Sequence, residues 1–301
     1  MNTILTSARH EVLCTLRARV ALLLLVVFLG MVSLSSLIGW ITNTTVTRVY
    51  EKILIDGLTT APNPFAAVSP LYYSHNSVIY VVLIGALMAI ILGVQATLRD
   101  RKSATADLVL SRPVNIVQKL IGQFLGLGAV IAAVLTASTV ISWASISVIV
   151  AAPLGFDPTL RLIGFAALSW TLMMIFALLG MLTGLYSRKE TTAMLVPFVI
   201  WSAIAFVLPQ IGTAARPVAL LNPVPALATS GSTSFDLISA VTGPFALTEQ
   251  FKRAASIVLR DDSVTGGPGL SPLLLLLAVL VAMIWIVVVT PRRTLRTGLN
   301  E

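Results

Sequence analysis

The side chains that could do chemistry in this sequence gather in a few short clusters, and the richest of these is residues 99–122. It holds five of the twenty Lys and Arg residues, at Arg99, Arg101, Lys102, Arg112 and Lys119. Long uncharged stretches flank the cluster on both sides, at residues 57–98 and 120–156. Cationic side chains in such a place are typical of a cytoplasmic loop between membrane spans, where they bind lipid headgroups or dock on a partner. The chemistry expected of this cluster is therefore binding.

The same cluster has an internal pattern of helix and turn. Residues 104–110 favour a short, partly apolar helix. Pro113 then breaks this helix, because proline has no N–H and restricts the residue before it. A second helix is expected to begin at Asn115 and to continue into the membrane. Such a helix, followed by a proline turn, can lie on the inner membrane surface and be displaced by a partner. The alternative interpretation is an ordinary basic loop.

Residues suited to making or breaking bonds are scarce. A Walker A loop needs Gly-Lys followed by Ser or Thr, and none of the five lysines follows a glycine. His10 and Cys14 share a helix face, but two ligands without a third make a weak metal site. The expected spans also contain almost none, at depth, of the carboxylates, His or Arg that proton relays and ion-coupled carriers use. We therefore expect no catalytic residue, no metal and no cofactor on this chain.

The composition places the chain in a membrane. It is 57% hydrophobic and 11% charged, with a mean hydropathy of +0.95, whereas soluble domains carry about 25% charged residues. The apolar runs between the charged clusters reach the roughly 20 residues that a helix needs to cross a bilayer. A pI near 10.2 could indicate a nucleic-acid partner. The enrichment of Lys and Arg in cytoplasmic loops explains it better, so no nucleic acid is expected.

These runs predict an all-α polytopic membrane protein with a single transmembrane domain, residues 1–301. Its six expected spans cover residues 20–41, 78–98, 120–150, 161–185, 191–211 and 272–289. External loops are expected at residues 42–77, where residues 46–58 favour a short surface helix, and at residues 212–271. Residues 153–160 are expected to form a tight turn between the third and fourth spans.

The N-terminal residues 1–19 are expected to form an amphipathic interfacial helix. Its apolar face would carry Ile4, Ala8, Val12 and Leu16, while Arg9, Glu11, Arg17 and Arg19 keep the rest polar. A signal peptide is the alternative, because a basic pair precedes an apolar run.

The charges also predict the topology. The N-terminal helix, residues 99–119, residues 188–190 and the tail together hold 13 Lys and Arg against 5 Asp and Glu. The remaining connections hold 7 of each sign, so the whole net charge of +8 falls on one side. Because Lys and Arg are enriched in cytoplasmic segments, both termini are expected in the cytoplasm.

Two further features concern packing and the outer side. Gly122 and Gly126 are spaced so that helices can approach closely. The long segment 212–271 is expected to cap a pathway or receive a partner, with a pair of interfacial helices at residues 235–241 and 245–259 as the alternative. Its candidate residues are Asn222, Pro223, Phe245 and Phe251.

The cytoplasmic cluster resembles the corresponding loop of ABC-2 type permeases, the membrane subunits of one class of ATP-binding-cassette transporter. The similarity is carried by Leu108-Val109-Leu110-Ser111-Arg112-Pro113-Val114, by Gln118-Lys119-Leu120-Ile121-Gly122 and by Gly126. Asp100 stands at the family's acidic position, and Ser103-Ala104-Thr105 at its Ser-Gly-Thr. Ala104 and Gln118 replace glycines of the family pattern.

The resemblance implies that this loop is a coupling helix that docks on a separate ATPase subunit. The residues implied in coupling are Asp100, Arg101, Lys102, Thr105, Asp107, Ser111, Arg112, Pro113 and Lys119. ATP and Mg would be bound by that partner, a second copy or a paralogous permease would complete the pathway, and the location would be the bacterial inner membrane. The chain is itself expected to be no enzyme.

The resemblance extends to one branch of the family, which includes the nitrous oxide reductase maturation permease. Its basis is the modest length of the chain, the long loop before the sixth span and Asn222-Pro223. That branch implies a periplasmic partner and a role in copper-enzyme maturation, so a non-transporting membrane scaffold is the main alternative to an exporter. An integral membrane enzyme is disfavoured by the uncharged spans, and the sequence names no substrate.

Overall fold

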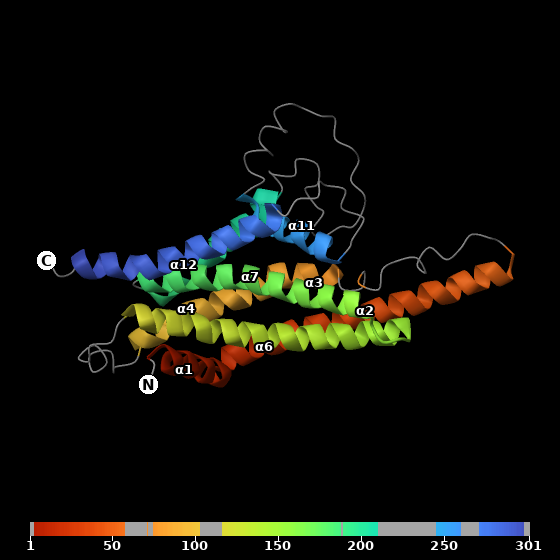
Figure 1. Cartoon of the computed structure of the whole chain (residues 1–301), viewed down its shortest axis with the longest axis horizontal. Helices are drawn as coiled ribbons and strands as arrows, with labels where there is room; N and C mark the ends of the chain where they lie inside the picture. The colour runs from red at the N-terminus through yellow and green to blue at the C-terminus, as the bar shows by residue number, and fades with distance from the viewer. Residues whose placement is uncertain are drawn as a thin grey trace, which may run out of the picture.

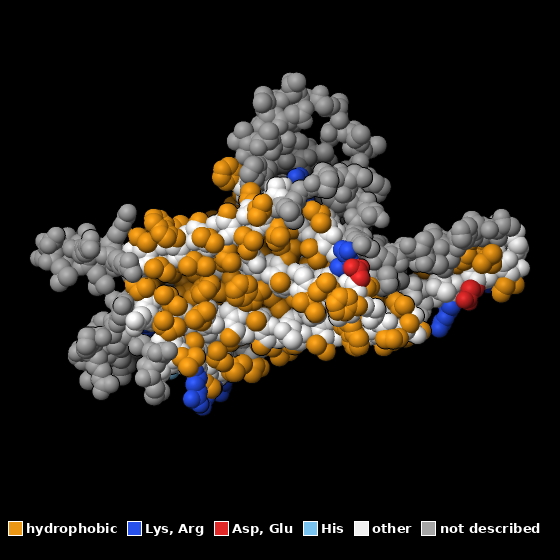
Figure 2. Space-filling model, viewed as in Figure 1, with side chains coloured by type: hydrophobic (Ala, Val, Ile, Leu, Met, Phe, Trp, Pro, Cys, Tyr) orange, Lys and Arg blue, Asp and Glu red, His pale blue; other side chains and the backbone are white. Residues whose placement is uncertain are grey.

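The computed structural model describes residues 3–57, 71, 75–102, 116–187, 189–209, 245–259 and 271–297. Its described residues form helices and no strands (Figure 1). Six helical segments are long and apolar enough to cross a membrane, which confirms the predicted number of candidate spans. Hydrophobic side chains cover most of the described part of the face shown in Figure 2, where few charged side chains are visible.

In the described residues, the helices follow one another in chain order. The N-terminal helix α1, Thr3–Arg17, leads into the first span α2, Arg19–Ile55. The second span is built from α3, His75–Tyr80, the π-helical segment η2, Val81–Gly85, and α4, Ala86–Lys102. The remaining described helices are α6, Ile116–Val150; α7, Phe156–Tyr186; α8, Glu190–Ser202, with its π-helical end η3, Ala203–Val207; α11, Leu247–Leu259, which is not a candidate span; and α12, Ser271–Thr297.

The helix of the first span, α2, is much longer than the sequence predicted. The span was expected to end at Ile41, yet α2 continues to Ile55 and absorbs the expected surface helix. No glycine or proline interrupts residues 42–55, and Gly57 then ends the helix with a φ of +67°, the left-handed conformation that glycine adopts at helix ends. Its 37 residues measure about 55 Å at 1.5 Å per residue, well beyond a hydrocarbon core of about 30 Å. Figure 1 shows the far end of α2 projecting past the bundle.

The turn before the fourth span is shorter than expected. Residues 153–160 were expected to be a turn, but α7 already begins at Phe156. Pro158 lies in the first helical turn, where its missing N–H would have no intrahelical partner in any case. Asp157, in the same turn, accepts a hydrogen bond of 2.8 Å from Arg161 Nε, and a carboxylate there is favoured by the helix dipole.

The fifth span accommodates Pro197 through a neighbouring side chain. Proline has no N–H for the carbonyl four residues earlier, which here belongs to Ala193. The Thr183 hydroxyl of α7 lies 3.2 Å from that carbonyl oxygen and 3.0 Å from the carbonyl oxygen of Gly180 in its own helix, so its one proton is shared between the two acceptors. A buried carbonyl without a donor is unfavourable in an apolar surrounding, so the contact makes the proline tolerable inside a membrane helix.

The centre of the bundle is the crossing of α4 and α7. In these two spans 67% of the most apolar stretch is buried, against 22% in α2, α8–η3 and α12. The backbones meet at three glycines. An added Cβ on Gly180 would lie 3.1 Å from the carbonyl carbon of Ile90, one on Gly93 would lie 2.9 Å from that of Ala177, and one on Gly184 would contact Thr97 Oγ1. Lipid tails are as apolar as side chains, so close packing of this kind is a main source of helix association in membranes.

Candidate functional site

The structure describes only part of the predicted site. Asp100, Arg101 and Lys102 lie in the last turn of the α4 backbone, so this helix continues past residue 98, where the second span was expected to end. Lys119 lies in the first turn of α6. The other predicted residues, Thr105, Asp107, Ser111, Arg112, Pro113, Asn222 and Pro223, fall outside the described residues.

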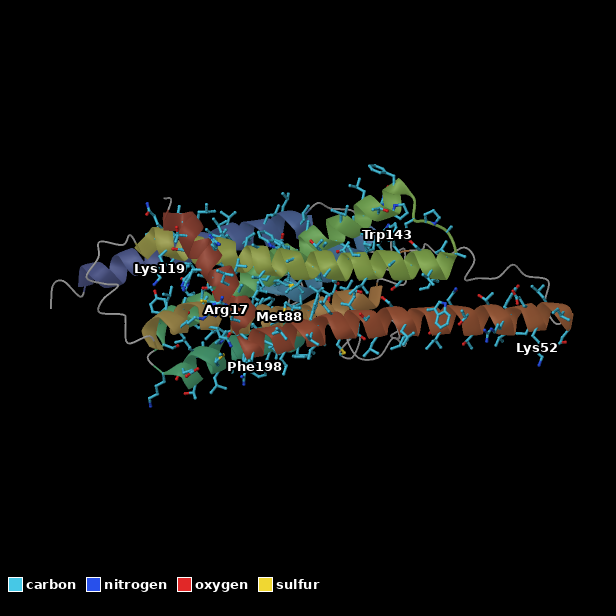
Figure 3. The ribbon with its side chains drawn as sticks, turned by 90° about the horizontal axis from the view of Figure 1, so that it is seen from below. Arg17, Lys52, Met88, Lys119, Trp143 and Phe198 are labelled. Atoms are coloured by element: carbon cyan, nitrogen blue, oxygen red, sulfur yellow. The ribbon has the colours of Figure 1, made fainter. Side chains whose placement is uncertain are left out.

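The two helices that flank residues 103–115 meet at one end of the bundle. Gln123 of α6 donates a buried 3.0 Å hydrogen bond from Nε2 to the carbonyl oxygen of Ala96 in α4. Figure 3 places Lys119 and Arg17 toward this end and Lys52 at the opposite end, on the projecting part of α2. The C-terminal end of α12 lies at the same end as α1 in Figure 1.

The N-terminal helix α1 crosses the beginning of α6 at the two predicted glycines. A Cβ on Gly122 would lie 2.5 Å from the Ser7 Cβ and 2.7 Å from the Ile4 carbonyl oxygen. One on Gly126 would lie 2.7 Å from the Ala8 carbonyl oxygen and 2.8 Å from the Glu11 Cβ. Because Gly122 and Gly126 have no side chain, the backbone of α1 packs directly against α6 at these two positions.

The buried face of α1 differs from the predicted one. Glu11, expected on the polar face, is only 2% exposed, whereas Leu16, expected on the apolar face, is 53% exposed. Arg99 of α4 donates from Nη1 to Glu11 Oε1 at 3.3 Å, and the hydroxyl of Thr15 donates to the same oxygen at 3.2 Å. The carboxylate turns inward because a guanidinium and a hydroxyl compensate its loss of hydration.

We call this arrangement the α1 junction, made of Glu11, Arg99, Gly122, Gln123 and Gly126. It joins α1 to the last turns of α4 and the first turns of α6, the two segments between which residues 103–115 run. Its interactions are an ion pair, a side chain to backbone hydrogen bond and two close backbone contacts. Such a junction can transmit force, because a displacement of either helix end is passed to the others.

The two partners of the ion pair are expected to respond unequally to substitution. Arg99→Gln withdraws the positive charge from a carboxylate that is 2% exposed, while Glu11→Gln leaves a guanidinium that is 30% exposed and can bind water. Removing one partner of a buried pair costs about 3–5 kcal/mol, and a partly exposed pair costs less. Arg99→Gln should therefore lower the thermal unfolding midpoint in detergent more than Glu11→Gln. The double variant Glu11→Gln with Arg99→Gln leaves no buried charge, so its midpoint should be higher than that of Arg99→Gln alone. Equal midpoints for the two single variants, or a double variant no more stable than Arg99→Gln, would contradict this account.

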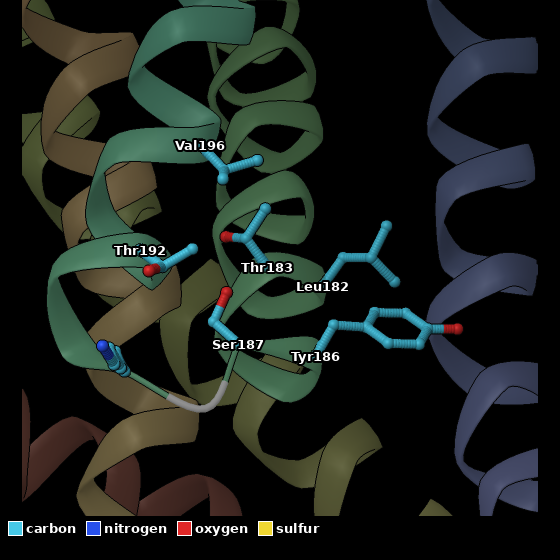
Figure 4. A pocket seen from close by; sticks show the side chains of 7 residues that line it. Leu182, Thr183, Tyr186, Ser187, Thr192 and Val196 are labelled. Atoms are coloured by element: carbon cyan, nitrogen blue, oxygen red, sulfur yellow. The ribbon is translucent and has the colours of Figure 1, made fainter.

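A groove opens near the same end, at the short connection between α7 and α8. It has a volume of about 670 Å³ and is lined by Leu182, Thr183, Tyr186, Ser187, Lys189, Thr192 and Val196. Figure 4 shows Tyr186 and Leu182 pointing across the gap toward α12, with Ser187 and Thr192 on the side of α8. The lining combines apolar side chains with hydroxyl groups and one cation, which suits an amphiphilic neighbour such as lipid.

The described residues of the predicted outer segment form α11, which is packed on the bundle. Phe251 is fully buried and contacts the ring of Phe165 in α7, with 6.3 Å between centroids. Phe245, just before the helix, is 70% exposed. Of these two predicted residues, only Phe245 is available on the surface.

Several residues that build this architecture were missed by the sequence analysis. Gly180 and Gly184 have the same small-xxx-small spacing that was noticed at Gly122 and Gly126, so a signal for them was present. Glu11 is the single acidic residue among the first 50, which could have marked it as a buried partner. Gly93 carries the same kind of signal, because Ala89 and Thr97 stand four residues away on either side.

Among the described residues, no group of three or more His, Cys, Asp and Glu side chains is placed to hold a metal ion. The Sγ of Cys14 lies 3.5 Å from Nε2 of His10 on the exposed side of α1.

Comparison with known proteins supplies the identity of the fold. Comparison with individual curated proteins gives no match. A family model described as ABC-2 family transporter protein matches residues 5–293, nearly the whole chain and all six candidate spans. The chain therefore belongs to the ABC-2 family of transporter proteins.

Proposed function

We propose that this protein is the membrane-spanning permease subunit of an ABC transporter, driven by ATP hydrolysis on a separate ATPase subunit. The observation that carries the proposal is the α1 junction, which ties three helices together beside the segment that resembles a coupling helix. Permeases of this family usually work with an ATPase subunit and are membrane components rather than catalysts. Because the junction holds α1, α4 and α6 together, a movement of the ATPase would displace the three helices as one unit.

The proposed topology places the α1 junction in the cytoplasm, where an ATPase would dock. Its support is the charge count, because Lys and Arg gather in the segments that this topology puts inside. The same topology places the projecting end of α2 and the helix α11 on the outer side. The proposed location is the bacterial inner membrane, and a second copy or a paralogous permease would complete the pathway.

The first test is affinity purification in mild detergent with identification of the bound subunits and an ATPase assay. An ATP-binding-cassette subunit is expected to copurify with the wild-type chain. Asp100→Arg or Pro113→Leu should remove that subunit while leaving the chain monodisperse, since both residues belong to the loop that resembles the docking segment. A matched control is Lys52→Glu, at the opposite end of the molecule (Figure 3). A chain that purifies alone, or loop variants that retain the ATPase, would contradict the proposal.

A second candidate function is a non-transporting subunit that passes ATPase motion to a partner on the outer side. The observation that favours it is α2, a continuous helix that leaves the bundle and ends with exposed apolar side chains, among them Val49, Leu54 and Ile55. The nitrous oxide reductase maturation branch would fit this role. Uptake or release of solute by reconstituted vesicles would favour transport, whereas an ATP-dependent change confined to a bound partner would favour transmission.

A further inference from the structure

The π-helical segment η2 in the second span leaves one carbonyl without its usual partner. In an α-helix the N–H of residue i bonds to the carbonyl of residue i−4, so Ala86 would bond to Val82. Here the N–H of Ala86 is directed to the carbonyls of Val81 and Leu83. The Val82 carbonyl instead accepts a hydrogen bond of 3.2 Å from the indole N–H of Trp201 in α8.

The fifth span repeats this arrangement at η3. The N–H of Leu208 bonds to the carbonyl of Ala203, five residues earlier, rather than to that of Ile204. The Ile204 carbonyl accepts a hydrogen bond of 3.0 Å from the hydroxyl of Thr248 in α11. Thr248 is fully buried and Trp201 is 5% exposed. In both spans, therefore, the carbonyl released by the π segment is satisfied by a side chain from a different helix.

The two sites are joined through Trp201. Its ring lies against Phe206 of η3 in an edge-to-face contact, with centroids 5.5 Å apart and an interplanar angle of 85°. The same indole donates to η2. Thr248 on α11, the segment η3, Trp201 and the segment η2 thus form one continuous series of contacts. The series ends where α4 begins, and α4 leads to Arg99 and the α1 junction.

A π segment has an alternative form, because its shifted hydrogen bonds can return to the α-helical register. An unpaired carbonyl is unfavourable in an apolar surrounding, so a donor from another helix stabilises the π form. When the donor leaves, the recovery of the bond from Ala86 to Val82 is favoured. Since π segments insert an extra residue into a turn, this return changes the rotation of α4 relative to α3. The donor therefore controls an element with two discrete states.

We propose that Trp201 and Thr248 are positioning residues that hold η2 and η3 in the π form and thereby link α11 to α4. A ligand or partner that displaces α11 would then be sensed at α4 and at the α1 junction. This role in signalling to an ATPase rests on the proposed function. The link between α11 and η2 itself is a property of the chain alone.

The test measures amide hydrogen exchange of the full chain in lipid nanodiscs, in peptides that cover residues 82–87 and 203–208. Thr248→Val keeps the shape of the side chain and removes its hydroxyl, and Trp201→Phe removes the indole N–H. Thr248→Val is expected to raise exchange by about three- to tenfold at residues 203–208 and also at residues 82–87, because a π segment whose side-chain donor is lost or displaced passes between the π and α registers, and each passage opens backbone hydrogen bonds. Trp201→Phe should raise it at residues 82–87.

Matched controls separate this effect from general loosening. Trp170→Phe removes an indole N–H that donates to the Gly128 carbonyl of α6 at 2.9 Å, and Thr171→Val removes a hydroxyl that bonds within its own helix. Neither should change exchange at residues 82–87. A Thr248→Val effect confined to residues 203–208, or absent, would overturn the inference.

The ATPase rate of the copurified complex is measured in a second arm. An ATPase rate that differs between the Thr248→Val complex and the wild-type complex supports signalling along this series. Raised exchange at residues 82–87 with an unaltered ATPase rate would overturn the signalling role and leave the structural link in place. If no ATPase subunit copurified with the wild-type chain, that result would count against the proposed function only.

Discussion

Gly180→Leu is expected to abolish the folded form of this protein. A Cβ on Gly180 would contact the carbonyl oxygen of Ile90 and would lie 3.1 Å from the Ile90 carbonyl carbon and from the Val94 nitrogen. These are backbone atoms of a buried helix, which cannot rotate away as a side chain can. Overpacking against side chains costs about 1–3 kcal/mol, and a contact with backbone costs more because α4 and α7 must separate. The total stability of a protein is about 5–15 kcal/mol, so the free-energy cost of separating α4 from α7 is enough to prevent folding.

The measurement is the yield of monodisperse protein in mild detergent, followed by size-exclusion chromatography, with the thermal midpoint of whatever remains. Gly180→Ala adds only the Cβ and should give an intermediate loss. Gly30→Leu in α2 is the matched control, since an ideal Cβ at Gly30 meets nothing within 4 Å beyond the adjoining residues of its own helix. If Gly180→Leu gave as much monodisperse protein as Gly30→Leu, the crossing of α4 and α7 would be wrong.

Gly122→Leu is expected to detach α1 from the bundle while the spans remain folded. A Cβ at this position would lie 2.5 Å from the Ser7 Cβ and 2.7 Å from the Ile4 carbonyl oxygen. The helix α1 packs chiefly on α6, so it would lose its main support and the ion pair between Glu11 and Arg99 would open. The central crossing of α4 and α7 does not involve Gly122 and should persist.

Limited trypsin digestion measures this detachment, because Arg9 and Arg17 lie on exposed positions of α1. Cleavage within an unfolded or detached helix follows the population of the open form, so a loss of about 1.4 kcal/mol raises the rate about tenfold. Ala129→Leu, at an exposed position of the same helix α6, should leave the rate unchanged. A cleavage rate for Gly122→Leu that equals that of Ala129→Leu would show that α1 does not depend on this contact.

Much of the architecture could be predicted because it depends on properties of single residues. Each span contains an apolar run of sufficient length, and the transfer of such a run into lipid is favourable wherever it lies in the fold. The short connection before the fifth span was likewise recognisable, from the charged residues 188–190. The resemblance of residues 100–126 to a coupling loop pointed to the family, and the match over residues 5–293 confirms it.

Helix ends and buried faces were less predictable. The span after residue 19 was expected to end at Ile41 because apolarity ends there, whereas the helix ends only at Ile55, next to Gly57. Hydropathy reports the preference for lipid, and a helix can continue in water without it. The face of α1 was misjudged for a related reason, since Glu11 is buried against Arg99, a residue 88 positions away in the sequence.

By itself, the sequence determined that this chain is a helical membrane protein with six candidate spans, and it pointed to the family of transporters to which the chain belongs. The tertiary structure decided which helices form the centre, that Gly93, Gly180 and Gly184 bring two backbones together, and that Trp201 and Thr248 complete the hydrogen bonds of two π segments. The physical reason is the range of the interactions. Partition into lipid is a sum over neighbouring residues, whereas backbone contact and carbonyl capping require atoms from distant parts of the chain to meet within a few ångströms.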